Sequence, residues 1–388
     1  MKIGIVTVHK APNYGANLQT YATWKCICDL GFDAEIIDLS LKAEPPRFPK
    51  MRPEFSKKHK VSIKFKIKML LRDFCVLLHL KKPIYTPPNI LPSAQVKFDE
   101  FNNLIKYSKK YNSVSELYEL GTDYDILITG SDQVWNPQQP WAMEPMFLTF
   151  AKKNQKKISY ASSIGIEDLR PNEKSLFAEW LKSYDAISVR ESVAQRLLTQ
   201  ITGRNDIEKV IDPTFLLSQE EWNDFAKKPS VVNPYILVFS LGHNQALIDY
   251  ALKLKHETGY DVKVVCLMPM PYTGNAYESI SDACPRELIG YISQAELVLT
   301  DSFHGTVFSI IMKAKNFYTY LFLSAKRNSR MIDLLTLFNL KNHILDNELL
   351  ESYEILESRA IDYVQVSTII NNERKRCMRW LNRVLKSN

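Results

Sequence analysis

The stretch TDSFHGT, residues 300–306, gathers side chains that can bind an anion and move a proton. It stands between an apolar run typical of a strand and an apolar run typical of a helix. Because the first N–H groups of a helix carry partial positive charge, they favour a phosphate or carboxylate. His304 suits proton transfer near neutral pH, and Gly305 lets the backbone approach a ligand. The alternative is that Asp301 or Ser302 only caps the helix while His304 packs nearby.

A second polar stretch, HKAPNYGANLQTYA, follows the apolar run at the start of the chain. Asn13 and Gly15 suit a turn that enters a helix, and Gln19 has an amide that a ligand could contact. A plain turn with a helix cap explains the same residues. YASSIG, residues 160–165, is a further polar cluster placed after a predicted strand.

Two more clusters follow predicted strands in the same half of the chain. TGSDQVWNP offers a run of polar groups and one flat apolar ring: Ser131, Asp132, Gln133, Trp135 and Asn136. Trp135 could stack on a sugar or lie in the core. Arg190, in ISVRE, stands where a helix is expected to start and could grip a carboxylate or phosphate with two donors. It could instead form an ion pair with Glu191 or Asp185.

Ten short runs rich in Val and Ile alternate with helical patterns and must position these clusters. The predicted strands are KIGIVTV, AEIIDL, DILITG, KISYAS, AISVRE and KVID, then YILVFSL, DVKVVCLM, LVLTDS and FYTYLF. The predicted helices cover 18–30, 171–182, 193–202, 246–257 and 285–294. Continuous apolar strands alternating with helices indicate parallel sheets covered on both faces. Such sheets bind ligands at the carboxyl ends of their strands, so the five clusters should line one cleft.

A chain of 388 residues is long enough for two hydrophobic cores. The break near DPTFLLSQEEW predicts an α/β protein with two Rossmann-like domains facing a cleft, at residues 1–217 and 218–388. We expect the first domain to hold the acceptor side with a basic excursion at 43–90, and the second the donor side. The last helix is expected to pack back on the first domain.

Composition and charge indicate a cytoplasmic protein. The six cysteines are scattered, which fits a reducing compartment, and neither a signal peptide nor a membrane-spanning run is apparent. Residues 47–82 contain twelve Lys or Arg against Glu54 and Asp73. This segment could lie on an anionic membrane surface, or form a helix that packs on the sheet with solvated lysines. No nucleic-acid-binding motif accompanies the charge.

Taken together, the clusters resemble the polysaccharide pyruvyl transferase family. The matching stretches, in order, are NYGANLQTYA, ITGSDQVWNP, SYASSIG, ISVRE, DPTFLL and TDSFHGTVFSI, and KRNSRMIDLLTLFNL is similar as well. The resemblance implies a GT-B-like fold. It also implies transfer of pyruvate from phosphoenolpyruvate onto two hydroxyls of a sugar, giving a cyclic ketal, with no metal and no cofactor besides the donor.

The resemblance also assigns roles to the residues. Arg190 and the helix start would bind the donor's charges, and His304 would protonate its methylene carbon or bind its phosphate. Asp301 or Asp132 would orient His304 or deprotonate the sugar. The expected catalytic residues are His304, Arg190 and Asp301. The expected substrate-binding residues are Asn13, Gly15, Gln19, Ser131, Asp132, Gln133, Trp135, Asn136, Ser302, Gly305 and Thr306.

The acceptor would be a sugar of a capsule, exopolysaccharide or cell-wall polymer, carried on undecaprenyl diphosphate at the inner membrane face. Two other functions fit the architecture. A GT-B glycosyltransferase would use a nucleotide sugar, although no Gly-rich diphosphate loop stands at the right place. A non-catalytic sugar-binding protein would need no proton-transfer residue.

Overall fold

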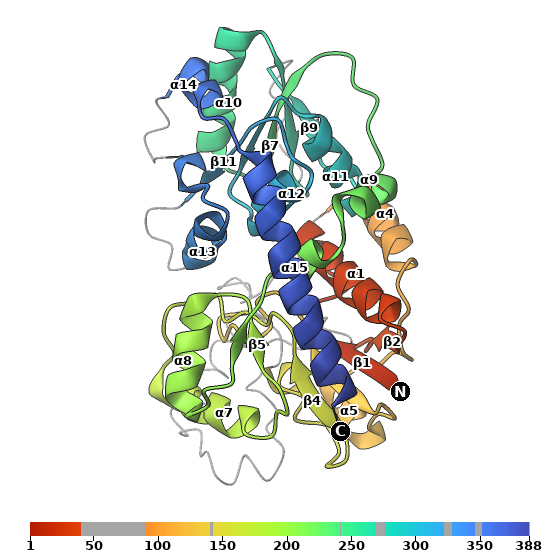
Figure 1. Cartoon of the computed structure of the whole chain (residues 1–388). Helices are drawn as coiled ribbons and strands as arrows, with labels where there is room; N and C mark the ends of the chain where they lie inside the picture. Colours follow the sequence, from red (N-terminus) through yellow and green to blue (C-terminus); the bar gives the residue numbers. More distant parts are fainter. Residues whose placement is uncertain are drawn as a thin grey trace, which may run out of the picture.

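The fold consists of two parallel sheets in sequence, each covered by helices (Figure 1). A computed structural model describes residues 1–39, 90–139, 143–240, 242–268, 276–321, 328–345 and 351–387. The predicted basic excursion therefore lies, up to residue 89, outside the described residues. None of the described helices is long and apolar enough to cross a membrane.

The first sheet has the strand order β2-β1-β3-β4, and all its pairs are parallel. Its strands are β1 (Lys2–Val6), β2 (Asp33–Ile36), β3 (Ile126–Thr129) and β4 (Lys156–Ser159). A short parallel pair, β5 (Ser188–Val189) with β6 (Glu208–Lys209), continues it through single bridges to the β4 side. In β3, Ile126 and Ile128 enter one hydrophobic cluster and Leu127 enters another. Both faces of this sheet are therefore buried, as a continuous apolar strand requires.

The second sheet has the order β12-β11-β10-β7-β8-β9, again with parallel pairs throughout. Its strands are β7 (Tyr235–Phe239), β8 (Asp261–Val265), β9 (Glu278–Ile280), β10 (Leu297–Thr300), β11 (Phe317–Tyr320) and β12 (Ile344–Leu345). All ten strands expected from the sequence are present, although β6 ends earlier than KVID suggested. Only the short edge strands β9 and β12 were missed, because so few residues give no readable periodicity.

The helices alternate with these strands. In the first half they are α1 (Tyr14–Asp29), α4 (Pro92–Asn102), α5 (Val114–Leu120), α6 (Met143–Met146), α7 (Pro171–Leu181) and α8 (Ser192–Thr202). The linking segment carries the 3-10 helix η1 (Pro213–Leu216) and α9 (Gln219–Phe225). The second half has α10 (Gln245–Thr258), α11 (Pro285–Gln294), α12 (Phe303–Ile311), α13 (Ser329–Leu337), η2 (Lys341–His343), α14 (Tyr353–Ser358) and α15 (Tyr363–Lys386).

One hydrophobic cluster joins the two sheets. It contains Ile3 and Ile5 of β1 together with Leu237 and Phe239 of β7. Across the junction, the ring of Tyr14 meets that of Phe239 edge-on, with centroids 5.5 Å apart. Since this interface is apolar and continuous, the two halves are held in one arrangement at the site that they share.

The last helix, α15, runs along the front of the molecule from the second half to the first (Figure 1). Arg374 donates from its guanidinium to the backbone carbonyls of Phe215 and Leu217, at 2.8 and 2.9 Å. Near the end of the helix, Lys156 of β4 donates to the hydroxyl of Ser387 at 2.8 Å. The C-terminal helix thus packs on the linking segment and on the first sheet.

Glu144, in α6, is a buried acid with an unusual titration. Neither of its carboxyl oxygens makes a hydrogen bond, and burial raises its pKa to about 7. In the unfolded chain the carboxyl group releases its proton near pH 4.3. The protonated carboxyl of Glu144 therefore adds nothing unfavourable to the free energy of unfolding below that pH, and the protein loses stability as pH rises toward the folded pKa. We expect the loss to reach about 3 kcal/mol by pH 8.

Glu144→Gln should therefore be more stable than wild type at pH 8 and of similar stability at pH 4. Urea unfolding followed by circular dichroism at the two pH values measures the difference. Equal stability of the two proteins at pH 8 would contradict this account of Glu144.

Candidate active site

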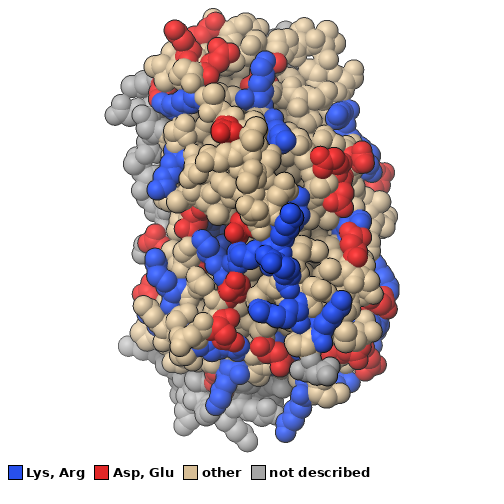
Figure 2. Space-filling model, in the orientation of Figure 1, with Lys and Arg blue, Asp and Glu red and all other residues tan. Residues whose placement is uncertain are grey.

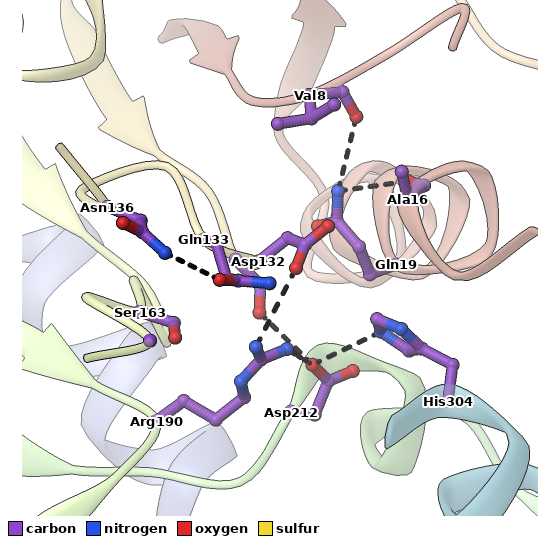
Figure 3. Close-up of polar contacts among 12 residues, drawn as sticks. Val8, Ala16, Gln19, Asp132, Gln133, Asn136, Ser163, Arg190, Asp212 and His304 are labelled. Carbon is purple, nitrogen blue, oxygen red and sulfur yellow. Dashed lines mark hydrogen bonds and ion pairs between the residues drawn. The ribbon is translucent and has the colours of Figure 1, made fainter. Parts of the chain in front are cut away.

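The candidate site is centred on the buried carboxylate of Asp212. Arg190 donates from Nη1 to Oδ2 of Asp212 at 2.7 Å, and Nε2 of His304 lies 3.7 Å from the same oxygen (Figure 3). The hydroxyl of Ser131 also donates to this oxygen, at 3.1 Å. Arg190 follows β5 and His304 lies in the first turn of α12, so each half of the chain supplies one functional side chain.

Local sequence fixes Asp212 in this position. The residue caps η1, and its Oδ1 accepts hydrogen bonds from the N–H and hydroxyl of Thr214, at 3.1 and 2.7 Å. Pro213 suits the first helical position because it needs no N–H partner there. The two carboxylate oxygens therefore divide their roles, one holding the turn and the other facing Arg190 and His304.

The electrostatics favour an ionised pair. Burial alone would raise the pKa of Asp212, but the neighbouring His304 and then the charge and hydrogen bond of Arg190 outweigh it and hold the pKa far below its usual range. Burial would lower the pKa of Arg190, and the neighbouring carboxylates of Asp212, Asp132 and Glu191 raise it instead. Arg190 is thus a permanent cation, 7% exposed, with Nε and Nη2 lacking hydrogen-bond acceptors.

His304 is held by contacts from both halves. A Cβ built on Gly15 of α1 would lie 2.0 Å from Nδ1 of the imidazole, so only glycine fits there. Phe303 meets the imidazole edge-on with centroids 5.2 Å apart. The Nε2 atom is buried and makes no hydrogen bond. Gly15 therefore serves by close approach to His304, and not by forming the turn expected from the sequence.

Asp301 was expected to orient His304 or to deprotonate the sugar, but its described contacts lie within the second half. Its carboxylate accepts from the hydroxyl of Ser240 and the amide of Asn244, both at 2.8 Å. Asp212 is the carboxylate that lies beside His304, and the sequence analysis did not select it. The only signal was its place in DPTFLL, where Asp before Pro reads as an ordinary cap.

The rest of the TDSFHGT turn has mainly structural contacts. Ser302 caps α12 by accepting from the N–H of Gly305 at 3.3 Å, and the hydroxyl of Thr306 donates back to the carbonyl of Ser302 at 3.2 Å. A Cβ on Gly305 would lie 2.3 Å from Oγ1 of Thr300. At Gly305 a side chain would therefore collide with the preceding strand, which gives this glycine a packing role.

The residues at the start of α1 that were expected to bind a substrate also have mainly structural contacts. Asn13 caps the helix, with its side-chain oxygen accepting from the N–H of Ala16 at 3.1 Å. Gln19 is fully buried and donates to the carbonyl of Ala16 at 3.0 Å and to that of Val8 at 3.4 Å (Figure 3). Gln19 thus ties α1 to the end of β1, and its amide nitrogen is not available to a substrate.

One prediction for the TGSDQVWNP cluster, that Trp135 stacks on a sugar, is wrong. Trp135 is fully buried, stacks on Phe147 at 5.1 Å and donates from its indole N–H to a backbone carbonyl, so it cannot stack on a sugar. Asn136 is likewise buried and donates to Gln133 at 2.7 Å. Asp132 and Gln133 are half-buried at the edge of the site. Asp132 has a φ of 70°, a left-handed conformation that asparagine and aspartate tolerate best.

Glu191 is a further residue that sequence reasoning treated only as an ion-pair partner. One of its carboxylate oxygens accepts from the hydroxyl of Ser163 and from the N–H groups of Ile164 and Gly165, at 2.9 to 3.1 Å. This explains the polar YASSIG cluster. The loop after β4 is fixed on Glu191, directly beside Arg190.

A pocket of about 330 Å³ adjoins the centre of the site. It is lined by side chains of the first half, the linking segment, α12, α13 and α15, including Arg190, Lys209, Asp212, Phe303, Arg330 and Arg376. Of the residues Arg190, Asp212 and His304, the first two therefore line the pocket, which lies between the two halves of the chain.

A model of the family described as polysaccharide pyruvyl transferase matches residues 13–318, most of the chain. No curated protein matches the sequence significantly.

Among solved structures, a UDP-N-acetylglucosamine 2-epimerase from Rickettsia bellii is 12% identical, with a TM-score of 0.51 and coverage of 98% of each chain. A UDP-GlcNAc 2-epimerase from Neisseria meningitidis is 11% identical, with a TM-score of 0.48 and coverage of 100% of each chain. At such identities the likeness concerns the fold alone. The expected fold class, α/β with two Rossmann-like domains of GT-B type, is confirmed.

Proposed function

We propose that this chain, which belongs to the polysaccharide pyruvyl transferase family, transfers pyruvate from phosphoenolpyruvate onto two hydroxyls of a sugar as a cyclic ketal. The observation that carries the proposal is the meeting of Arg190 and His304 on one buried carboxylate, Asp212. A donor that carries a carboxylate and a phosphate and must accept a proton needs a fixed cation with an imidazole beside it.

The chemistry follows from the residues in place. Arg190 binds an anionic group of the donor, and His304 delivers a proton to the methylene carbon, which becomes a methyl group. One sugar hydroxyl attacks the central carbon and the C–O bond to phosphate breaks. The second hydroxyl then closes the ring. Of the two hydroxyl protons, one leaves with the phosphate and the other restores the proton that His304 gave up. Asp212 keeps Arg190 in place and, at 3.7 Å from Nε2 of His304, orients the imidazole.

Asp132 and Gln133 are the candidates for contacts with the acceptor. Both are half-buried at the carboxyl end of β3, and Oδ1 of Asp132 lies 3.7 Å from Nη2 of Arg190. A carboxylate at this distance from Arg190, which is proposed to bind the donor, can accept a proton from a sugar hydroxyl. Asp301 of the second half remains a candidate for the opposite side of the acceptor.

The acceptor is proposed to be a sugar of a capsule or exopolysaccharide precursor, carried on undecaprenyl diphosphate. The protein would then work in the cytoplasm, in peripheral contact with the inner membrane. The basic composition of residues 47–82 supports that contact, because anionic lipids attract clustered Lys and Arg. The proposed reaction needs no cofactor besides the donor.

Purified protein with phosphoenolpyruvate and a galactoside acceptor is expected to release inorganic phosphate. Phosphate release and the mass of the acceptor measure the reaction together, since ketal formation adds pyruvate less one water. The control replaces phosphoenolpyruvate with a nucleotide sugar and should give no product. Absence of phosphate release across a panel of free and lipid-linked acceptors would contradict the proposal.

A further inference from the structure

The last helix, α15, carries an exposed row of cationic side chains. The helix contains six Lys or Arg and one acid, Glu373. Four of the six are exposed, and we call them the basic stripe: Lys375, Arg379, Arg383 and Lys386. Because residues three and four apart lie on the same side of a helix, the stripe forms one line about 16 Å long.

The opposite side of α15 is fixed to the protein. Its buried residues here are Cys377, Trp380, Leu381, Val384 and Leu385. The ring of Trp380 meets that of Tyr160, in the first half, with centroids 6.3 Å apart. The stripe is therefore held outward on a rigid support. Figure 2 shows Lys and Arg side chains gathered near the middle of this face, where α15 passes between the halves.

The acids near α15 are matched by its other two arginines. Arg376 forms the ion pairs of this helix that occur among the described residues, both at 2.7 Å, with Glu208 and Glu373. Arg374 donates to backbone carbonyls, and the carboxylates that stabilise its charge are those of Glu221 and Glu220. The four charges of the stripe are thus left without a counter-charge in the part of the chain that the structure describes.

Exposed lysines elsewhere on the molecule differ from the stripe in this respect. Ion pairs join Lys106 to Asp33, Lys152 to Asp123 and Lys315 to Glu296. These pairs neutralise the surface locally, so no extended field of one sign arises from them. The stripe is the opposite case, a line of one sign that can attract an extended anion.

The stripe also works against the stability of its own helix. Lys375 and Arg379, and again Arg379 and Arg383, are like charges four residues apart, which repel each other on a helix surface. Arg383 and Lys386 stand near the negative C-terminal end of the helix dipole, which offsets the repulsion there. That effect falls off within the last turn and does not reach Lys375 and Arg379. Helix stability alone therefore does not account for the stripe.

One end of the stripe lies beside the pocket that Arg190 and Asp212 line. Glu373 and Arg376 also line that pocket, and Lys375 stands between them in the helix. A flat anionic surface in contact with the stripe would thus lie next to the pocket. A substrate anchored in that surface would have a short path to the candidate site.

We propose that the basic stripe of α15 docks the protein on an anionic phospholipid bilayer. Charge complementarity carries the choice of an anionic partner, and a bilayer extends over the full length of the stripe, as a single small anion does not. The choice of a bilayer over other extended anions rests on the proposed function, in which the acceptor is carried on a lipid.

The test is sedimentation of the full-length protein with lipid vesicles, in the absence of donor and acceptor. Wild type should bind vesicles that contain phosphatidylglycerol at low salt, and should not bind pure phosphatidylcholine vesicles. The stripe variant combines Lys375→Gln, Arg379→Gln, Arg383→Gln and Lys386→Gln. Its partition coefficient for the anionic vesicles should be about 100-fold lower than that of wild type.

The control variant removes the same number of charges from exposed lysines elsewhere: Lys110→Gln, Lys228→Gln, Lys253→Gln and Lys341→Gln. It should bind within about threefold of wild type, because exposed charges farther from the lipid than a Debye length are screened. Both variants should keep the wild-type circular dichroism spectrum, since the replaced side chains are exposed.

The outcomes separate this inference from the proposed function. A folded stripe variant that binds anionic vesicles within about threefold of wild type would overturn the inference, as would a wild type that does not bind them at low salt. Tighter binding of wild type to a DNA duplex than to the vesicles would assign the stripe to nucleic acid instead. Since the assay needs no turnover, a protein that binds through the stripe but transfers no pyruvate contradicts the proposed function and supports the docking surface.

Discussion

Replacing His304 with Gln is expected to lower kcat for phosphate release by about 100- to 10,000-fold. Gln fills similar space beside Gly15 but cannot deliver a proton near neutral pH, so the proposed protonation of the methylene carbon is lost. Because the imidazole lies where a Cβ on Gly15 would stand, Gln, a side chain of similar size, is the conservative choice. Steady-state phosphate release at saturating phosphoenolpyruvate measures the effect.

The matched control is His256→Gln, at an exposed position in the last turn of α10. It should retain wild-type kcat, and both variants should keep the wild-type circular dichroism spectrum. A folded His304→Gln protein that keeps more than a tenth of the wild-type kcat would rule out His304 as the principal proton donor, even if the reaction is right.

Asp212→Asn is expected to damage both stability and turnover. The substitution preserves shape but leaves the buried guanidinium of Arg190 without its closest counter-charge, at a cost of about 3 to 5 kcal/mol. Turnover should fall as well, because Arg190 and His304 both take their position from this carboxylate. Urea unfolding and phosphate release on the same preparation measure the two effects.

The stability effect of Asp212 has a defined pH dependence. Its folded pKa lies far below its unfolded value, near 3.9, so its contribution is complete above that pH and declines as pH falls toward the folded pKa. The difference between wild type and Asp212→Asn should thus be constant from pH 5 to 8 and shrink below about pH 4. Ser113→Ala, which removes the side-chain cap of α5, is a control whose smaller effect should not vary with pH in this range. A pH-independent difference for Asp212→Asn would contradict the ion-pair account.

The sheets were predictable from sequence because each buried strand is a continuous apolar run bounded by polar turns. In β7, Tyr235 to Phe239 are all fully buried, and no surface alternation interrupts the pattern. The short edge strands gave no such signal. The segment KVID was predicted to be strand as far as Asp212, but the strand ends at Lys209, and Asp212 caps η1 instead.

The candidate site was only partly predictable. Arg190 and His304 stand out because a charged or titratable residue directly after a buried strand has few structural reasons to be there. Asp212 was missed because its local cap is ordinary, while its contacts with Ser131, Arg190 and His304 join residues distant in sequence. Trp135 and Gln19 were assigned to a substrate wrongly, since a strand end near a cleft also needs apolar packing and internal hydrogen bonds, and composition cannot distinguish these uses.

Because Gly15 and His304 come from different halves of the chain, their contact makes the position of the imidazole depend on how the two halves pack together. The imidazole rests on the first turn of α1, so any hinge movement that parts the two domains also withdraws His304 from its support. Under the proposed reaction, any change in the packing of the two halves would therefore displace the group that is proposed to donate the proton.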